Sequence, residues 1–307
     1  MSLEIKSPLF SCTDEDKVEI RRELGLKESV IEEDIDSILE WFEKQPHLVD
    51  AGINRAFIQT MLLICKGSRE LAKGRIDNYY RHRGLIPEVI QNREKVLSGS
   101  EDLWRIQFQV AIPKLYKGYR ISLAGFLDPD PSVFSLEASL KNAFMISDIR
   151  MQCDYLLGDI WILDMKNCSA GHVLKLNPMI VQKFLFQKSL RVKIKAIHII
   201  NANNLLQPVI NFLKPFFNPK IFDRIMVHDT LEDLQEQVPK MYLPKDYGGE
   251  QLSVLELKDL HEKELRNAKT KQFLIKASNI VSDETKRPKT ELGEDCLAGS
   301  FKNITID

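Results

Sequence analysis

The sequence predicts an α/β protein in which a largely parallel sheet, flanked by helices, follows an N-terminal helical module. Residues 28–90 have the apolar spacing of helices, and from about residue 118 short apolar runs alternate with helical stretches. A chain of 307 residues with 44% apolar content can also bury a large core. We expect a helical module over 1–95, a sheet domain over 96–250, and a C-terminal helix and tail over 251–307 that pack back on that domain.

The N-terminal module is predicted to contain three helices. The first is amphipathic, with an acidic outer face and four apolar residues spaced along one side: Ile31, Ile35, Ile38 and Phe42. A second helix is expected over 56–64, and Ser68 is a suitable N-cap for a third. Together these helices can bury one another's apolar faces.

The sheet domain follows from the alternation of strands and helices. Strands are predicted at 119–127, 159–164, 192–200 and 225–227, with helices over 136–157, 177–189 and 204–217 between them. Helical crossovers between strands imply parallel pairing and burial of both sheet faces. Another helix follows Gly249, and the tail is expected to end in a strand over 300–306.

Composition excludes several classes of protein. No apolar run approaches the roughly 18 residues of a membrane span, and the first ten residues lack the pattern of a secretory signal. Five widely spaced cysteines without a CxxC pair indicate free thiols in a reducing cytosol, with no metal site and no cofactor. A net charge of −1 gives no reason to expect nucleic-acid binding.

The predicted helix over 204–217 is apolar on more of its circumference than an ordinary surface helix. Its polar residues form one narrow stripe: Asn204, Gln207, Asn211, Lys214 and Asn218. One interpretation is a helix buried on most sides. The other is a helix with one apolar face inward and another available to a membrane. Pro215 is expected to break or kink the helix near Lys214.

Basic residues cluster on both sides of that helix. Residues 183–224 contain eight Lys or Arg and one acid, Asp223, in a chain of net charge −1. A charge run is often only a solvated face. Several cations beside exposed apolar residues, however, would also favour reversible docking on an anionic bilayer.

Enzymes are the second class considered. The sequence has no G-x-S-x-G, P-loop or dinucleotide fingerprint, and its six histidines show no i, i+4 pairing. Asp164 ends a strand, where catalytic groups often lie, but an Asx-type bond that holds the following loop through Asn167 and Ser169 is favoured. His172 can orient the same loop, and His198 is interpreted as a hydrogen-bonded core residue.

Several segments, taken in order, resemble the CRAL-TRIO lipid-binding family. They are Asp164 to His172, Lys193 to Asn201, Phe212 to Phe216, His228, and the Leu-Pro-x-x-Tyr-Gly-Gly motif from Leu243 to Gly249. The upstream helices resemble the family's N-terminal three-helix module. The tail, with Asp283 to Pro288 and Gly299 to Phe301, is similar to insect members in the branch of α-tocopherol transfer protein and cellular retinaldehyde-binding protein.

The resemblance implies a lipid-exchange domain whose cavity is closed by a mobile gate helix, here residues 204–217. It also implies a basic cleft that grips a phosphoinositide headgroup. The cleft residues would be Lys193, Lys195, Lys220 and Arg224, and the ligand-lining candidates are Phe144, Met145, Trp161, Leu163, Ile194, Ile197, Val209, Leu213 and Phe217. Family members commonly have Arg or Lys where this chain has Leu63 and Cys65, so one wall of the cleft is expected to be weaker.

We therefore expect a cytosolic, peripherally membrane-associated monomer that carries a small hydrophobic ligand with a polar end and does no chemistry on it. The ligand would be a tocopherol-, retinoid-, carotenoid- or sterol-like lipid, and the other partner a phosphoinositide-containing membrane surface. Two alternatives stay open. One is a phosphoinositide-responsive adaptor that transports nothing, and the other is a lipid-ester hydrolase.

Overall fold

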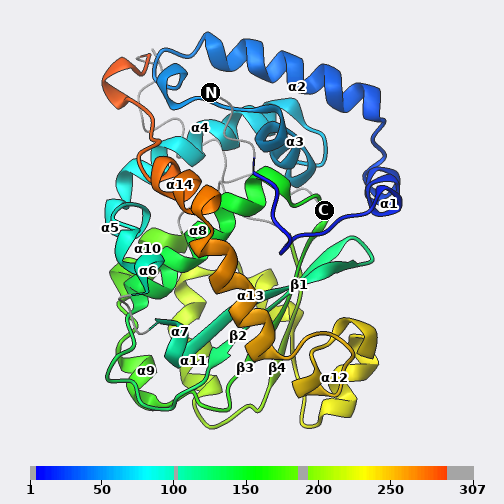
Figure 1. The fold of residues 1–307 in the computed structure, drawn as a ribbon, viewed down its shortest axis with the longest axis vertical. Coiled ribbons are helices and arrows are strands. Elements are labelled where there is room, and N and C mark those ends of the chain that lie inside the picture. The colour runs from blue at the N-terminus through cyan, green and yellow to red at the C-terminus, as the bar shows by residue number, and fades with distance from the viewer. Residues whose placement is uncertain (1–4, 100–102, 186–192, 289–307) are drawn as a thin grey trace.

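The computed structural model describes residues 5–99, 103–185 and 193–288, and it has a five-stranded sheet at its centre (Figure 1). The strands follow one another across the sheet in chain order, and every pair is parallel except the first. The largely parallel sheet is therefore confirmed. The strands are β1 (Gln107–Tyr116), β2 (Tyr119–Phe126), β3 (Gly158–Asp164), β4 (Ile194–Ile200) and β5 (Ile225–Val227).

The edge strand β1 was missed in the sequence analysis, which placed the start of the sheet domain's strands near residue 118. β1 and β2 form an antiparallel hairpin in which Tyr116 pairs with Tyr119. Lys117 and Gly118 make the turn, both at positive φ, as a tight two-residue hairpin loop requires. Alternation of Gln107 and Gln109 with Phe108 and Val110 is the strand pattern that marks β1.

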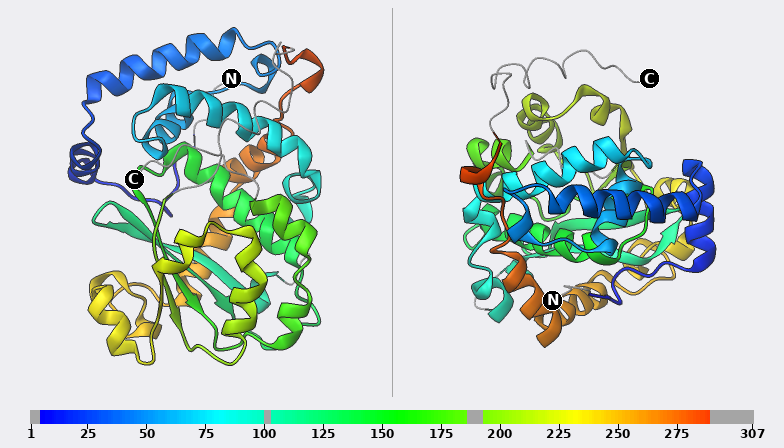
Figure 2. Two further views of the ribbon diagram at one scale, coloured as in Figure 1. Left: turned by 180° about the vertical axis from the view of Figure 1, so that it is seen from behind. Right: turned by 90° about the horizontal axis from the view of Figure 1, so that it is seen from above.

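Helices cover both faces of the sheet (Figure 2). α13 (Val254–Arg266) lies on one face, where Val254 and Leu257 pack with Ile160 and Ile162 of β3. α8, α10 and α11 lie on the opposite face. The helices of this domain are α7 (Leu103–Ile106), α8 (Leu136–Cys153), α9 (Ala170–Leu174), α10 (Pro178–Leu185), α11 (Leu206–Leu213) and α12 (Leu231–Gln237). The sequence analysis did not predict α12.

The N-terminal helices stack on the end of the sheet domain and have a core of their own (Figure 1). The four apolar residues expected on one side of the first amphipathic helix are all buried in that core: Ile31, Ile35, Ile38 and Phe42. An additional helix, α1, precedes the three that were predicted. The helices are α1 (Asp14–Leu24), α2 (Glu28–Glu43), α3 (Arg55–Ile64), α4 (Arg69–Leu85), α5 (Pro87–Ile90) and α6 (Glu94–Ser98).

A buried ionic cluster joins the N-terminal helices to α8. The carboxylate of Asp148 lies 2.8 Å from Arg83 and 2.7 Å from Arg93, and it accepts a hydrogen bond from Tyr79. Burial disfavours the Asp148 carboxylate, but the two guanidinium groups outweigh that effect and hold its pKa below its ordinary value. The cluster therefore fixes α4 and the start of α6 against the sheet domain.

The C-terminal segment packs on both parts of the protein. α14 (Ala268–Ala277) lies against α8, and the chain after it returns to the N-terminal helices, where Arg287 pairs with Asp77 at 2.9 Å. Residues 251–288 thus bridge the sheet domain and the helical module. The expected strand over 300–306 lies outside the described residues.

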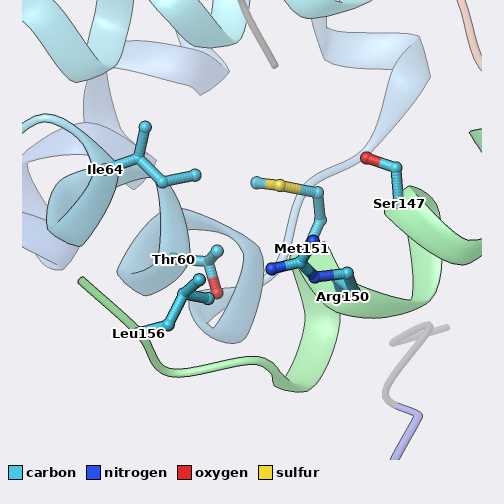
Figure 3. A pocket seen from close by; sticks show the side chains of 6 residues that line it. All are labelled: Thr60, Ile64, Ser147, Arg150, Met151 and Leu156. Carbon is cyan, nitrogen blue, oxygen red and sulfur yellow. The ribbon is translucent and has the colours of Figure 1, made fainter. Parts of the chain in front are cut away.

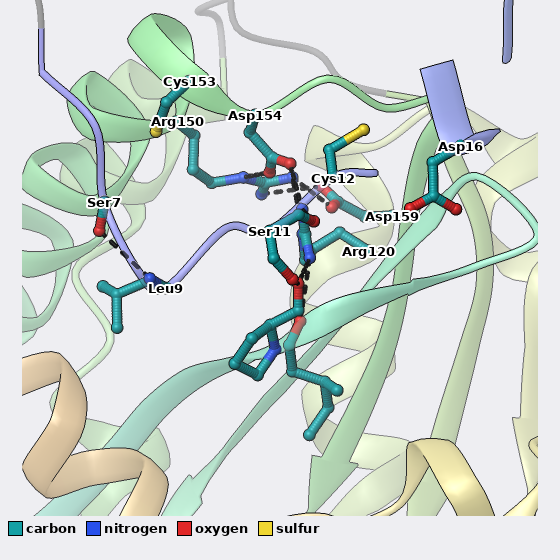
Figure 4. A network of polar contacts seen from close by, with 12 residues as sticks. Ser7, Leu9, Ser11, Cys12, Asp16, Arg120, Arg150, Cys153, Asp154 and Asp159 are labelled. Carbon is teal, nitrogen blue, oxygen red and sulfur yellow. Dashed lines mark hydrogen bonds and ion pairs between the residues drawn. The ribbon is translucent and has the colours of Figure 1, made fainter. Parts of the chain in front are cut away.

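The N-terminal arm is anchored by a second buried network (Figure 4). Arg120 contacts Asp154 at 2.6 Å and donates to the Ser11 carbonyl at 3.1 Å, while Arg150 bridges Asp154 and Asp159. The Phe10 ring lies 5.6 Å from the Arg120 guanidinium carbon. These contacts join the arm, β2, α8 and β3 near the start of the parallel strands.

Candidate functional site

The segment from α11 to Phe217 has no fully buried side chain, which distinguishes it from the other helices on the sheet. All five residues of its polar stripe are exposed, and the apolar residues Leu206, Val209 and Phe212 are partly exposed. α11 ends at Leu213 and a 3-10 turn, η3 (Lys214–Phe216), follows, as Pro215 predicts. A helix buried on most sides, the first interpretation above, is therefore not what the fold contains.

The sheet face on the α11 side is also incompletely buried. Trp161 and Leu163 of β3 are partly exposed, whereas Ile160 and Ile162 on the α13 side are buried. Ile197 pairs in register with Trp161 and is partly exposed too. In a close-packed layer, side chains on the central strands of a covered sheet would be buried on both faces. The layer between the sheet and α11 is therefore less completely filled than the layer beneath α13.

The lining candidates come from several elements. Trp161, Leu163 and Ile197 lie on the sheet face opposite α13, and Val209, Leu213 and Phe217 are partly exposed residues of the gate segment. Met145 on α8 is fully buried in the cluster that includes Ala111 of β1. Trp161 and Leu163 share one face of β3, as residues two positions apart on a strand do, whereas Ile160 and Ile162 share the other.

One candidate lies apart from the others. Phe144 is buried in a separate cluster with Ile86, Val89 and Ile90, so α8 directs it toward α5. Ile194 pairs with Asp159, which lies two positions before Trp161 on β3 and so shares its sheet face. A β-bulge between Asp159 and Ile160 places one extra residue in β4, so strand parity does not separate Ile194 from Ile197.

The basic residues predicted for the cleft gather at the start of β4. Lys193 donates to the Tyr119 hydroxyl at 3.1 Å, and its ammonium lies 5.5 Å from that ring; the ammonium of Lys195 lies 6.0 Å from it. Arg224 closes the short 3-10 helix η4 (Pro219–Arg224) and donates to the carbonyl of Ile194. Lys220 is exposed on the same turn.

The opposite wall offers no cation at the two positions considered. Leu63 is buried with Ile20, Leu115 and Tyr155, and Cys65 is buried in the core of the N-terminal helices. Of the other basic residues between positions 183 and 224, Lys188 and Arg191 lie outside the described residues.

Comparison with known proteins matches two domain families to this architecture. The sequence profile described as "CRAL/TRIO domain" matches residues 117–249, and that described as "Pinta-like, UBA domain" matches 27–98. The chain therefore contains a CRAL/TRIO domain. Its match to residues 117–249 covers β2 to β5 and the gate segment, so the basic cleft lies within the CRAL/TRIO domain.

Individual relatives are distant. The α-tocopherol transfer protein-like proteins of Mus musculus and Homo sapiens are 24% identical to this chain over 248 and 247 residues, which is 78% of this chain and 71% of theirs. Clavesin-1 of Rattus norvegicus is 23% identical over 235 residues, 75% of this chain and 66% of its own. The crystal structure of Sfh5 superposes with a TM-score of 0.40 at 13% identity, covering 80% of this chain and 92% of that one.

The CRAL-TRIO motif from Leu243 to Gly249 is a tight turn fixed to the sheet. Gly248 has φ of 70°, and a Cβ at Gly249 would lie 2.0 Å from the Leu243 carbonyl oxygen, so only glycine fits. The Tyr247 hydroxyl donates to Oδ2 of Asp164 at 3.0 Å. The motif thus holds the carboxyl end of β3.

Two hollows accompany the site. The smaller, about 20 Å³ between α3 and α8, is lined by Thr60, Ile64, Ser147, Arg150, Met151 and Leu156 (Figure 3). It has room for about one water molecule. The larger, about 350 Å³ and open to solvent, lies at the start of α8, with Phe134, Lys175 and Asn177 in its wall. The small hollow is too small for a lipid.

The candidate enzyme groups have structural partners. Asp164 accepts from the Lys166 amide at 2.9 Å and from Asn201, which makes the Asx-type bond that was expected, although with Lys166 and not with Asn167 or Ser169. His198 is buried and hydrogen-bonded to His228 at 2.8 Å. Burial and the neighbouring His228 lower the pKa of His198 to about 4, so both rings are neutral at pH 7.

His172 is tied to its own loop, as predicted. Its Nδ1 accepts from the Ser169 amide at 3.1 Å, and its ring stacks on Phe126 with centroids 3.9 Å apart. Within residues 5–99, 103–185 and 193–288, no group of three potential metal ligands occurs, and no helix is long and apolar enough to cross a membrane.

Proposed function

We propose that this protein holds one small hydrophobic ligand between the sheet and α11 and exchanges it with membranes, without doing chemistry on it. The observation behind this proposal is the shared partial exposure of the gate segment and of Trp161, Leu163 and Ile197 beneath it. A carrier needs an apolar layer that is not already filled by its own side chains. It also needs a cover that can move, and a short helix with no buried residue meets that need.

The relatives support a transfer role. Proteins named α-tocopherol transfer protein-like match 78% of this chain, and the CRAL/TRIO profile covers the gate segment and the motif that ends at Gly249. By analogy, the ligand would be a tocopherol-, retinoid-, carotenoid- or sterol-like lipid. We further propose that the protein is a cytosolic monomer that associates with membranes peripherally.

Phosphoinositide binding is the second part of the proposal. Lys193 and Lys195 both lie near Tyr119, and Arg224 contacts the backbone carbonyl of Ile194, which lies between them in sequence. Cations gathered at the start of β4 raise the local positive potential, and a polyphosphorylated headgroup would neutralise it. The loop between η3 and η4 connects this cleft to the gate segment, so headgroup binding would act on the gate.

The decisive experiment is native mass spectrometry of the purified protein, followed by solvent extraction. The proposal expects one bound lipid per chain and its transfer to acceptor vesicles, faster when these contain phosphatidylinositol 4,5-bisphosphate. A phosphoinositide-responsive adaptor would bind those vesicles yet carry and release no lipid. Release of a fatty acid or an alcohol from a bound ester would instead support the hydrolase alternative.

A further inference from the structure

Two buried polar groups without partners lie on either side of Phe126, at the end of β2. Gln107 is the cross-strand neighbour of Phe126 in the β1–β2 hairpin, and His172 stacks on its ring. The Nε2 atoms of both Gln107 and His172 are buried and have no hydrogen-bond partner among the described residues. The two residues are 5% and 2% exposed. Leaving such groups unpaired costs free energy, so each one requires an explanation.

The hydrogen-bonding role of His172 is fixed by its loop. A backbone amide can only donate, so the Ser169 N–H requires a lone pair on Nδ1, and a neutral ring must then carry its proton on Nε2. Burial lowers the pKa of His172, which keeps the ring neutral. The unpaired Nε2 is therefore a hydrogen-bond donor at neutral pH.

One end of the Gln107 side-chain amide also has no hydrogen-bond partner among the described residues. Its Oε1 lies 2.8 Å from the Ser139 hydroxyl, which lies 2.9 Å from the Ser135 carbonyl as well. One hydroxyl proton cannot serve both oxygens. The Gln107 amide therefore takes a hydrogen bond from Ser139 or gives one to it, and its other end stays unpaired in either orientation. Asn142, one helical turn along α8, likewise has a buried carbonyl oxygen without a partner.

These groups face the same layer as the proposed ligand. Cross-strand neighbours share a sheet face, so Gln107 and Phe126 point the same way, and Ser139 of α8 contacts Gln107 on that face. Two residues back along β2, Ala124 lies on the same face and pairs in register with Leu163. Both Ala124 and Phe126 are partly exposed. The apolar layer beneath α11 thus extends to Phe126 and ends at polar atoms.

We propose that Gln107 and His172 bind the polar end of the ligand, and that this end is a hydroxyl group. A hydroxyl accepts a hydrogen bond from His172 and can also donate to or accept from the free end of the Gln107 amide, whichever end that is. A pure hydrocarbon cannot pair either group, and an ether or ester oxygen can only accept. This inference rests on the proposed carrier function and narrows its ligand to a lipid alcohol or phenol.

The test uses three pairs of probes that differ only in that hydroxyl: α-tocopherol, retinol and cholesterol, each with its methyl ether. Dissociation constants are measured for the full chain and for His172→Phe and Gln107→Leu, which keep a ring and an apolar side chain in place. The wild type should bind at least one free alcohol about tenfold more tightly than its ether. In both variants the ratio of the dissociation constants for the ether and the alcohol should fall toward one, while affinity for the ether is retained.

Matched controls separate this effect from general damage. His82→Phe and Gln237→Leu make the same substitutions far from Phe126, and both should keep the preference for the alcohol. Equal binding of alcohol and ether by the wild type, or an unchanged preference in the two site variants, would overturn the hydroxyl site while the carrier function stands. A wild-type protein that binds none of the six probes would count against both proposals. Because the wild-type comparison needs no variant, the inference is tested even if a substitution prevents folding.

Discussion

Tyr247 donates its phenolic hydroxyl to Oδ2 of Asp164 across 3.0 Å, joining residues 83 positions apart in the sequence. Asp164 also fixes the loop after β3, through the Lys166 amide and the side chain of Asn201. The same carboxylate therefore supports the Leu243–Gly249 turn and the ends of β3 and β4. Residues that are recognisable as a sequence motif act here by holding one edge of the sheet.

Replacing Tyr247 with Phe should lower the free energy of unfolding by about 1–2 kcal/mol, because the partly buried Asp164 carboxylate loses one of its hydrogen bonds. Urea denaturation followed by circular dichroism measures the change. Tyr242→Phe is the control, since its ring packs on Tyr116 and its hydroxyl has no partner among the described residues. It should change stability by less than about 0.5 kcal/mol. Equal effects of the two substitutions would contradict the structural role of the bond to Asp164.

The Asp148 cluster predicts a larger effect. In Asp148→Ala, Arg83 and Arg93 remain buried without their counter-charge, so unfolding free energy should fall by about 3–5 kcal/mol. Because the cluster connects α4 to α8, limited proteolysis should also cut between the helical module and the sheet domain. Asp14→Ala removes an exposed carboxylate that pairs with Lys17 and should leave both measurements nearly unchanged. Wild-type stability in the Asp148 variant would show that the cluster contributes little.

The protein should become less stable as the pH is lowered from about 6.5 to about 4, because His261 is buried in its neutral form. Its Nε2 accepts from the Ala111 amide, its Nδ1 donates to the Leu257 carbonyl, and burial lowers its pKa to about 4. The unfolded state, with a histidine pKa of about 6.5, then binds more protons than the native state over this range, so acid favours unfolding. Between pH 7 and pH 5 the loss should be about 2 kcal/mol for this residue.

The measurement is urea denaturation at pH 7 and pH 5. His261→Gln removes the titrating group. Between pH 7 and pH 5 this variant should therefore lose about 2 kcal/mol less unfolding free energy than the wild type. Identical pH dependence in the two proteins would mean that His261 titrates normally in the folded state. His198 should add a loss of the same sign, since its pKa is also lowered to about 4.

The gate segment predicts how the protein meets a membrane. Phe216→Asp combined with Phe217→Asp places two carboxylates on a surface that would enter the bilayer, and liposome co-sedimentation should be abolished. Both residues are partly exposed in the fold, so circular dichroism should be unchanged. Leu255→Asp introduces a charge at an exposed apolar position of α13, on the other face of the sheet, and should not reduce binding. Undiminished co-sedimentation of the gate variant would remove this segment from the membrane-binding surface.

The basic cleft predicts phosphoinositide-stimulated ligand release. Lys193→Ala with Lys220→Ala removes two cations from the start of β4 and from η4, and stimulation by phosphatidylinositol 4,5-bisphosphate should fall at least several-fold. Lys263→Ala with Lys269→Ala makes the same change in net charge at exposed positions of α13 and α14 and should have no such effect. Equal stimulation in both double variants would indicate that the cleft does not recognise the headgroup.

Several features of the candidate site could be predicted from the sequence because they depend on local spacing. The polar stripe of α11, its end before Pro215, and the parity that separates Trp161 and Leu163 from Ile160 and Ile162 all follow from helix and strand geometry. Phe144 could not be separated from Met145 in this way. Adjacent helical positions can each be buried, and only the packing of α8 between α5 and the sheet decides which partner each one meets.

By itself, the sequence determined the order of most elements, the two-sided apolar character of the gate segment and the presence of a CRAL/TRIO domain, because periodicity and motifs depend on short stretches of chain. Tertiary structure alone decided that Gln107 and His172 flank Phe126 and that Asp164 meets Tyr247. These pairs are 65 and 83 residues apart. Which polar groups end up buried without a partner depends on contacts that no local pattern encodes.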